Sequence, residues 1–473
     1  MSLQIRMDGQ VVDLTPDTSV GLELINPFLA YEDILSNRAT IPALPATRRN
    51  RIILGFPDLL QSEAVGMRYK CEKYYNGQRL QAGVAILTEA AQTFALAVVQ
   101  PLGELFGDAQ KKTLPELSFG TLALPATLTP TLQQFGRNVL AFPTVLNADF
   151  YGTNGTAINY SGRVNNYQAG AYTAAGPVVP FPFLKEILLQ ISELTGVSIT
   201  GQFMEDPDLS QLLLYNTRAL DGRTTVELQK HLPELTIPGL LLELRKLFNL
   251  AMRVDTNERA IRLDFMDNYH KMATSKDWSK KALKGAKKRP EMARRLQLGS
   301  EQDSGDGLTK DKPPILADYL TPELATETTI TPLTSRFSTL LTDPATGLAI
   351  TSQAGISEQF GQLSSKFTPR LLFWNGLQAA PNAEPLPVAT AKRGALSLYW
   401  TGADGLAATF WKRTEANRVS RFYLERNLDL NEVDLATLDF SEKVHINGLD
   451  YWVASISISL PIKQPATALL VRA

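Results

Sequence analysis

The sequence is poor in cysteine and histidine. It has 473 residues but only one cysteine, Cys71, and three histidines, His231, His270 and His445. A single cysteine excludes an internal disulfide, and cysteine and histidine are the usual ligands of a zinc site. The three histidines lie far apart in the sequence, and none is close to a cysteine. We therefore expect no disulfide, no metal site and no other cofactor.

Long apolar runs and an excess of one charge are missing too. The longest apolar region, 81–106, is interrupted by polar residues and Pro101, whereas a membrane-spanning helix needs about 18–20 apolar residues. The 47 basic and 48 acidic residues nearly cancel, whereas nucleic-acid binders rely on clustered Lys and Arg. We expect no transmembrane segment and no sequence-specific binding of nucleic acid. The first ten residues have no apolar signal core, so we expect synthesis in the cytoplasm.

Common catalytic motifs are absent from the sequence. It contains no phosphate-binding glycine loop, GxSxG elbow, HExxH helix or CxxC pair. Glu205, Asp206 and Asp208 have the chemistry of a glycosidase acid and base, but Asp and Pro together are also typical of a turn. Asp303 and Asp306 lie in DSGDG, which lacks the spacing and closing glutamate of a calcium loop and is expected to be a solvated turn. We assign no catalytic, cofactor-binding or metal-binding residue.

Single residues that often carry function also have structural interpretations. Each histidine is expected to be a surface or partly buried imidazole. Cys71 lies in an expected strand and is predicted to be a small buried side chain. An adhesin would use exposed aromatic residues to bind carbohydrate, but at strand positions we favour a core or interface role for Trp374, Trp400, Trp411 and Trp452.

What the sequence does contain is ordinary globular composition over a long chain. It is 44% hydrophobic and 20% charged, with 28 prolines and 31 glycines spread along it. This length exceeds what one hydrophobic core normally serves, so about two to four domains are expected. The spread of proline and glycine favours many short elements joined by loops.

The first hundred residues indicate antiparallel β-structure. Apolar residues alternate on both sides of Asp8-Gly9 and of Asn76-Gly77. Both dipeptides are strong hairpin signals. A further strand is expected from Val20 to Ile25. The following region is less regular, with short helices predicted at 102–109 and 131–140 and a loop at 151–175.

A helix–strand–turn–strand pattern then occurs twice, at 181–215 and 237–265. In the second copy Pro238 suits the first turn of a helix, and apolar residues recur at helical spacing. Beyond it, 253–265 reads as strand, polar turn and strand. The two copies predict an α/β module whose helices cover one face of a sheet.

Together these patterns predict an α+β, β-rich, multi-domain chain. The basic run 280–295 is predicted to be a solvated loop, with contact to an acidic neighbouring subunit as the alternative. The expected division is as follows: an N-terminal antiparallel β domain at 1–105, a loop-rich insertion at 106–178, the α/β module at 179–279, a β-rich and loop-rich domain at 280–390, and a C-terminal β domain at 391–473.

Four stretches in this order resemble a known family. They are 40–57, 181–215, 235–278 and 429–473, and the first and last contain the patterns TIPxLPxTxxNRxxLGFP and DxxxLDFxxxVxIxGxxYxV. The chain resembles the tail-hub or tail-tip proteins encoded by phages and prophages of Bacteroidota-type bacteria. More distantly, it is similar to the central hub of contractile baseplates and the tail-associated protein of long non-contractile tails.

The resemblance implies a structural role at the distal end of a virion tail. It implies a homotrimer that matches a sixfold tail tube by presenting two tube-like β-barrel domains per subunit, and that forms part of the DNA passage. Implied partners are the tail tube and distal tail proteins, the tape measure protein and a tip spike or fibre protein. It implies no catalytic residues. The alternatives are a tail-associated cell-wall or polysaccharide hydrolase and a carbohydrate-binding tail-tip adhesin.

Overall fold

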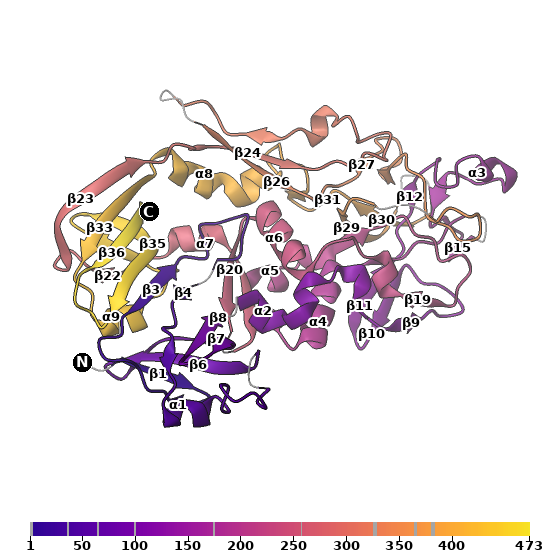
Figure 1. The fold of residues 1–473 in the computed structure, drawn as a ribbon. Helices are drawn as coiled ribbons and strands as arrows, with labels where there is room; N and C mark the ends of the chain where they lie inside the picture. Colours follow the sequence, from indigo (N-terminus) through magenta and orange to yellow (C-terminus); the bar gives the residue numbers. More distant parts are fainter. Residues whose placement is uncertain are drawn as a thin grey trace.

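The structure is a computed structural model. It describes residues 3–35, 37–63, 66–98, 101–173, 176–256, 258–324, 329–363, 367–379 and 384–473. Strands from both ends of the chain gather at one end of an elongated molecule, helices fill the middle, and short strands and loops form the other end (Figure 1). The chain is β-rich and belongs to the α+β class, as predicted.

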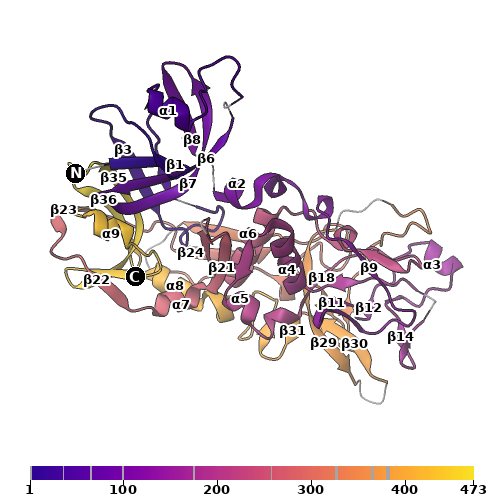
Figure 2. The ribbon, with the colours of Figure 1, turned by 90° about the horizontal axis from the view of Figure 1, so that it is seen from below.

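The N-terminal region forms a six-stranded antiparallel sheet, as its hairpin signals predict. Its strands lie in the order β2 (Gln10–Val11), β1 (Leu3–Met7), β6 (Arg68–Tyr75), β7 (Gln78–Ala90), β8 (Thr93–Val98) and β5 (Leu44–Pro45). The turns at Asp8-Gly9 and Asn76-Gly77 have positive φ at both residues, the geometry that joins two strands by two residues. Helix α1 (Arg48–Ile53) lies at the outer end of this sheet (Figure 2).

A second sheet combines the C-terminus with strands from elsewhere in the chain. Its order is β22 (Thr274–Asp277), β34 (Lys443–Ile446), β35 (Leu449–Leu460), β36 (Ala466–Arg472), β33 (Phe422–Leu428) and β23 (Ala282–Pro290), and β3 (Val20–Ile25) pairs with β35 and with β4 (Arg38–Ala39). Val20 lies opposite Leu460, so an N-terminal strand completes the C-terminal sheet.

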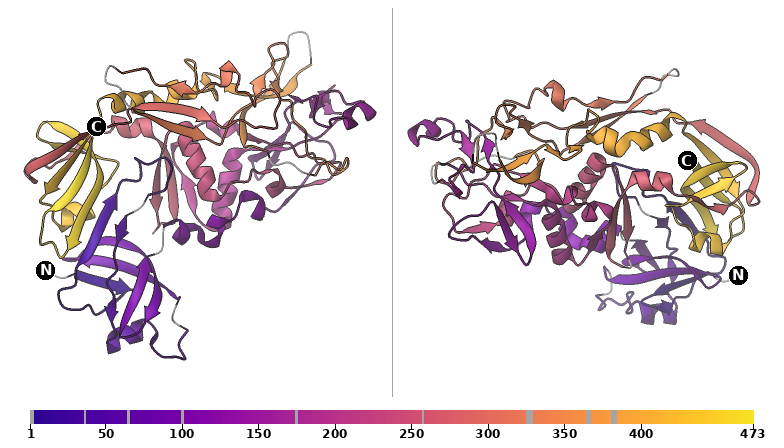
Figure 3. Two further views of the ribbon diagram at one scale, coloured as in Figure 1. Left: turned by 45° about the horizontal axis from the view of Figure 1, so that its top comes forward. Right: turned by 180° about the vertical axis from the view of Figure 1, so that it is seen from behind.

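The two sheets share one apolar cluster, to which Ile5 and Leu87 contribute from the first sheet and Ile456 and Leu470 from the second. We call the two sheets together the β body, and both chain termini lie in it (Figure 3). The five-part division of the chain stays a prediction, because a shared core does not by itself say which segments fold independently.

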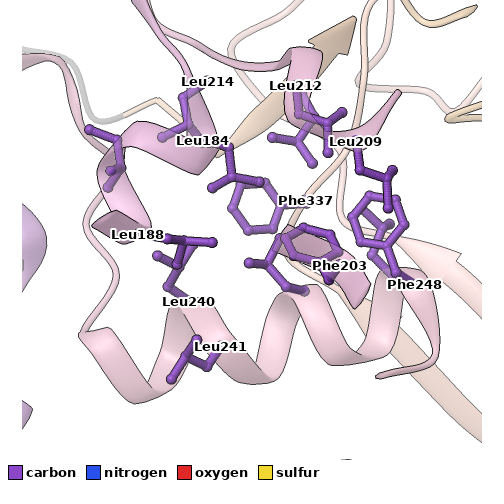
Figure 4. Close-up of a cluster of buried hydrophobic side chains, with 14 of the residues drawn as sticks. Leu184, Leu188, Phe203, Leu209, Leu212, Leu214, Leu240, Leu241, Phe248 and Phe337 are labelled. Carbon is purple, nitrogen blue, oxygen red and sulfur yellow. The ribbon is translucent and has the colours of Figure 1, made fainter. Parts of the chain in front are cut away.

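The middle of the molecule is built on two amphipathic helices, α4 (Leu184–Thr195) and α6 (Ile237–Phe248). The Thr236 hydroxyl caps α6 by accepting a hydrogen bond from the Gly239 amide at 3.1 Å. Leu184 and Leu188 of α4 and Leu240 and Phe248 of α6 contribute to one apolar core (Figure 4). Helix α4 is therefore held by burial of one face, as its spacing predicts, whereas α6 is buried around most of its circumference.

The two helix–strand units differ in how their strands pair. In the second unit β20 (Leu250–Asp255) and β21 (Ala260–Phe265) form the predicted hairpin, although Asn257 in its turn lies outside the described residues. In the first unit β17 (Ser198–Thr200) pairs in parallel with β21, and β18 (Leu212–Tyr215) pairs with β29 (Arg370–Gln378) in another sheet.

The end of β17 comes very close to β21. A Cβ at Gly201 would lie 2.4 Å from the Leu263 carbonyl oxygen, so only glycine fits there. The chain then turns through α5 (Gln202–Glu205) and η3 (Leu209–Gln211) before β18. The predicted direct return strand is therefore wrong, because this turn redirects the chain into the next sheet.

Three other local predictions differ from the structure. The loop expected at 151–175 contains the one-turn helix α3 (Asn154–Ala157) and three two-residue strands, β13 to β15, between 163 and 172. Residues 131–140, predicted to be a short helix, form the hairpin of β10 (Thr131–Gln134) and β11 (Arg137–Ala141) around a tight turn at Phe135-Gly136, where both φ values are positive. The basic run 280–295, predicted to be a loop, contains β23, because the edge of β33 offers it backbone partners. The short helix at 102–109 is confirmed as α2 (Pro101–Phe106) followed by η1 (Gly107–Lys111).

The remaining elements are short. The strands are β9 (Thr121–Ala123), β12 (Val145–Leu146), β13 (Arg163–Val164), β14 (Tyr167–Gln168), β15 (Ala171–Tyr172), β16 (Phe181–Pro182), β19 (Thr225–Glu227), β24 (Arg295–Ser300), β25 (Tyr319–Leu320), β26 (Ile330–Ser335), β27 (Leu341–Thr342), β28 (Ala349–Ile350), β30 (Leu386–Thr390), β31 (Lys392–Arg393) and β32 (Leu396–Ser397). The helices are α3 (Asn154–Ala157), α7 (Met266–Lys271), α8 (Lys412–Val419), α9 (Glu432–Ala436), η2 (Leu114–Glu116), η4 (Leu228–His231), η5 (Pro314–Leu316) and the π-helix η6 (Ala407–Trp411). Among the described helices, none has both the length and the apolar character needed to cross a membrane.

Candidate functional site

The acidic group at 205–208 is arranged as a turn. Asp206 accepts hydrogen bonds from the amides of Asp208 and Leu209 at 3.0 and 2.9 Å. Asp208 forms an ion pair with Arg393 at 3.1 Å. Asp206 thus stabilises the turn and Asp208 is neutralised by a neighbouring strand, which is the structural interpretation that the sequence favoured.

The DSGDG segment is the clearest error of the sequence analysis. Asp303 and Asp306 are buried and surround the fully buried Arg370, instead of lying in a solvated turn. Arg370 Nη1 lies 2.7 Å from Asp306 Oδ2, and its Nη2 lies 3.8 Å from Asp303 Oδ2. The guanidinium also hydrogen-bonds Gln353 and lies 4.5 Å from the centre of the Tyr215 ring. We call these residues the Arg370 cluster.

The Arg370 cluster keeps its carboxylate charged inside the protein. Burial alone raises the pKa of Asp306, but hydrogen bonds from Thr351 and the Ser352 amide, together with the charge of Arg370, lower its pKa overall. The Thr351 hydroxyl donates to Asp306 Oδ2 at 2.7 Å. Every strong contact of the carboxylate is therefore with the protein itself, which indicates a structural ion pair that locks two distant segments together.

The sequence signal for the Arg370 cluster is a charged residue at the start of an apolar run that is typical of a buried strand. Arg370 opens a run that continues Leu-Leu-Phe-Trp, and β29 is buried over its first five residues. An arginine at the start of such a strand needs a buried anion. The partner could not be identified from the sequence, because Asp306 lies 64 residues away.

His231 is buried, and His270 is partly buried. His231 Nδ1 lies 3.1 Å from Asn216 Oδ1. Burial lowers the pKa of His231 to about 3, and the positive charge of Arg218 lowers it in the same direction. His270 packs on Trp452, and burial lowers its pKa to about 4. The third, His445, is partly exposed, and its Nδ1 lies 2.7 Å from Asp450 Oδ1.

Cys71 and Lys73 lie on the core face of β6. Cys71 is buried, as predicted, and burial raises the pKa of its thiol. Lys73 is only 3% exposed, and burial lowers its pKa to about 8. Its Nζ donates to Gln81 Oε1 at 2.9 Å. The alternation of the strand predicts this position, because Tyr69 and Tyr75 share the same buried face.

The four tryptophans considered for carbohydrate binding are core residues. Trp374, Trp400, Trp411 and Trp452 are all at most 7% exposed. Trp400 Nε1 donates to Ser300 Oγ at 2.8 Å. Their predicted core role is confirmed, and none of them offers an aromatic face to a sugar.

One hollow lies on the β body, beside β3 and the adjoining ends of β35 and β36. It measures about 930 Å³, and its lining includes Gly21, Glu23, Arg38, Ser457 and Lys463. No aromatic or histidine side chain lines it. Within the residues that the structure describes, no three His, Cys, Asp or Glu side chains are grouped so as to hold a metal ion.

Exposed apolar side chains gather in one segment beside the six-stranded sheet of the β body. Ile52 and Phe56 are 54% and 43% exposed, Leu59 is 53% exposed and Leu60 is fully exposed. We call residues 52–60 the apolar loop. Its sequence after Ile52, ILGFPDLL, is mostly apolar and contains one charged residue, Asp58. This run is a sequence signal for a contact surface that the predictions above did not include. A concentration of exposed apolar side chains commonly marks a contact surface.

Comparisons with known proteins gave matches only to solved structures. No protein-family model and no curated protein matches the chain. Among the matched structures are the 43 kDa tail protein of prophage MuSo2 from Shewanella oneidensis and the tail protein from Neisseria meningitidis MC58. The first is 11% identical over 99% of this chain and 98% of that chain, with a TM-score of 0.37. The second is 10% identical over 99% and 95%, with a TM-score of 0.36.

A third match is the prophage tail protein gp18 from Listeria monocytogenes EGD-e. It is 8% identical over 85% of this chain and 83% of that chain, with a TM-score of 0.31. At these identities and TM-scores the likeness transfers no residue role and no partner. All three matched structures are tail proteins, the class that the sequence resemblance names.

Proposed function

We propose that this chain is a structural component of a phage tail. In this proposal it is a trimeric hub at the distal end of the tail, where it joins the tail tube to the tip or baseplate and lines part of the DNA passage. The four stretches that resemble tail-hub and tail-tip proteins support the role. Three of them, 40–57, 235–278 and 429–473, contribute strands to the β body.

The observation that carries the proposal is the paired construction of the β body. One chain supplies two sheets that share a core, the first antiparallel and the second antiparallel except for the β22–β34 pair, and strand β3 ties the N-terminus to the C-terminal sheet. Three such chains would present six sheets. That number suits the sixfold tube implied by the resemblance, and closed rings are the usual form of such assemblies.

The apolar loop supports assembly. It lies beside the six-stranded sheet, where a neighbouring tail protein or a second copy can cover it. Burying the exposed parts of Ile52, Phe56, Leu59 and Leu60 would stabilise an interface, at about 25 cal/mol for each Å² of apolar surface removed from water.

The balanced charge supports a passage for DNA. A strongly basic lumen would bind the phosphate backbone, whereas the net charge of this chain is −1. A nearly neutral subunit allows DNA to pass without being held.

We infer a structural role and not a catalytic one. Asp206 and Asp208 are engaged in a turn and an ion pair, and the tryptophans considered for an adhesin are buried. Among the described residues no contact favours the hydrolase or adhesin alternatives.

Co-expression with a tail-tube protein of the same virus tests the proposal. We expect the two proteins to copurify, and electron microscopy to show the chain as a cap at one end of short tubes. Tubes that form normally but never carry the chain would contradict the proposal.

A further inference from the structure

Strand β23 is a long, open edge of the C-terminal sheet. It pairs with β33 from Ala282↔Leu428 to Pro290↔Phe422, with an irregular register between Ala282 and Ala286. Among the described strands, β33 is its sole partner, so β23 ends the sheet on that side. It forms the outer margin of the β body in Figure 1. The outward-facing amides and carbonyls of β23 therefore form a template for one more strand.

The strand is strongly basic. Four of its nine residues are cations, Lys284, Lys287, Lys288 and Arg289, and none is acidic. All residues from 283 to 290 are exposed. Positive charge is thus concentrated along a free edge in a chain whose total charge is close to zero.

The sheet neutralises only part of this charge. Arg289 forms an ion pair with Glu425 at 2.8 Å, and Lys288 Nζ lies 4.1 Å from the centre of the Phe422 ring. Within the part of the chain that the structure describes, Lys284 and Lys287 have no ion-pair partner. These two ammonium groups remain available to an anion outside the chain.

We propose that β23 binds an extended, acidic segment of another protein, which adds to the sheet as a further strand. The backbone of β23 would bond the added strand, and the lysines would select its charge. Directly opposed side chains in such a pair lie about 4.5–5.5 Å apart, within reach of opposite charges. The regular register along 286–290 gives the added strand a straight stretch to follow.

The same features explain which strands are rejected. Lysines, a terminal proline and an irregular register are the devices by which edge strands avoid aggregation. Two β23 strands side by side would oppose like charges, so a second copy is disfavoured at this edge. An acidic strand is attracted by the same lysines that repel a basic strand, so the charges of this edge select an acidic partner. The proposal is independent of the proposed tail function, since it concerns the chemistry of one edge.

Binding of labelled peptides to the full chain tests the proposal. The first probe is a capped peptide of about eight residues that alternates threonine and glutamate, a length suited to one added strand. A second peptide replaces glutamate with glutamine. A third keeps the glutamates but replaces two threonines with proline, which removes backbone donors without changing charge. Fluorescence anisotropy measures each affinity, and a short DNA duplex is the fourth probe.

We expect the threonine–glutamate peptide to bind at least tenfold more tightly than the other three probes. The double variant Lys284→Glu/Lys287→Glu should lose at least tenfold in that affinity and gain affinity for a threonine–lysine peptide. The matched control Lys111→Glu/Lys310→Glu changes two exposed lysines elsewhere and should bind like the unaltered protein. Circular dichroism of each variant confirms that the fold is retained.

Four results would overturn the proposal. Equal binding of the proline-containing acidic peptide would mean that charge alone acts, without strand addition. Tighter binding of the duplex would make the edge a DNA contact. Self-association that the Lys284→Glu/Lys287→Glu variant abolishes would make it a contact between copies. Absence of peptide binding would leave β23 a protected edge.

Discussion

Arg370 and Asp306 form an ion pair in which neither side chain is exposed to solvent. Arg370 Nη1 lies 2.7 Å from Asp306 Oδ2. Arg370 begins β29, and Asp306 lies in the turn that precedes 307–312, so the pair connects two segments far apart in the sequence. Removing two charges from water is unfavourable by several kcal/mol for each ion unless each is paired. The pair is therefore a point where a single substitution should have a large effect.

Arg370→Met should destabilise the protein by about 3–5 kcal/mol, because it leaves the Asp306 carboxylate buried without its cation. The double variant Arg370→Met/Asp306→Asn should recover part of this loss, since no unpaired charge remains. Urea unfolding of the two single variants and the double variant measures the coupling. Effects that simply add would contradict an energetic link between the two residues.

Lys73 should make stability depend on alkaline pH. Its pKa is lowered from 10.5 to about 8 by burial in the folded protein. Between these two values the unfolded chain holds a proton that the folded chain lacks, so stability rises with pH from about 8 to 10.5 and is reduced below that window. Lys73→Met should remove this slope and stabilise the protein at pH 7 by up to about 3 kcal/mol.

The control for this experiment is Lys70→Met. Lys70 lies on the exposed face of the same strand, three residues earlier in β6. Its replacement removes a lysine charge from the same strand at an exposed position, so comparison of the two variants separates the effect of burial from the loss of a charge. If the free energy of unfolding changes with pH equally in the unaltered protein and in Lys73→Met between pH 8 and 10.5, Lys73 does not cause the pH dependence.

His231 should contribute to acid destabilisation. Its pKa falls from 6.5 in the unfolded chain to about 3 in the folded protein, mainly through burial. As the pH falls from 6.5 towards 3, the unfolded chain takes up a proton that the folded chain does not, so stability is lost by at most about 1.4 kcal/mol per pH unit. His231→Gln keeps a hydrogen-bond donor for Asn216, and its free energy of unfolding should fall less steeply as the pH decreases from 6.5 towards 3. An equally steep loss of stability in this variant would show that His231 does not titrate in this way.

The apolar loop should govern association without governing folding. Leu59→Ser/Leu60→Ser replaces two exposed side chains, so we expect a change in unfolding free energy within about 0.5 kcal/mol. We expect a clear loss of self-association in sedimentation velocity. Leu363→Ser/Leu377→Ser, which changes two exposed leucines outside the β body, is the matched control. Equal loss of association in both variants would exclude a specific role for the loop.

The sequence allowed prediction of local structure better than of long-range pairing. Asn76-Gly77 marked a hairpin and Pro238 marked a helix start, because the chemistry of turns and helix starts depends on adjacent residues. The pairing of β3 with β35 could not be predicted, since any apolar strand satisfies an alternating pattern. The hairpin at Phe135-Gly136 was missed because its residues are equally compatible with a short helix.

The candidate site was predicted in part for the same reason. Cys71 was assigned correctly to the core, because burial follows from alternation along β6. The tryptophans are buried as predicted, but Trp400 and Trp411 lie outside strands, so their expected strand positions were wrong. The acidic DSGDG segment was misassigned because its polarity indicates exposure, whereas Arg370 supplies a buried counter-charge from a distant strand. Such partnerships are decided by tertiary structure.

The mass of the purified chain in solution tests the central proposal most directly. Sedimentation equilibrium should be recorded over a wide concentration range, alone and with the tail-tube protein. A structural tail hub of the proposed kind predicts a species of three times the mass of one chain, stabilised further by the tube protein. A chain that stays monomeric at high concentration and does not associate with the tube protein would contradict the proposal.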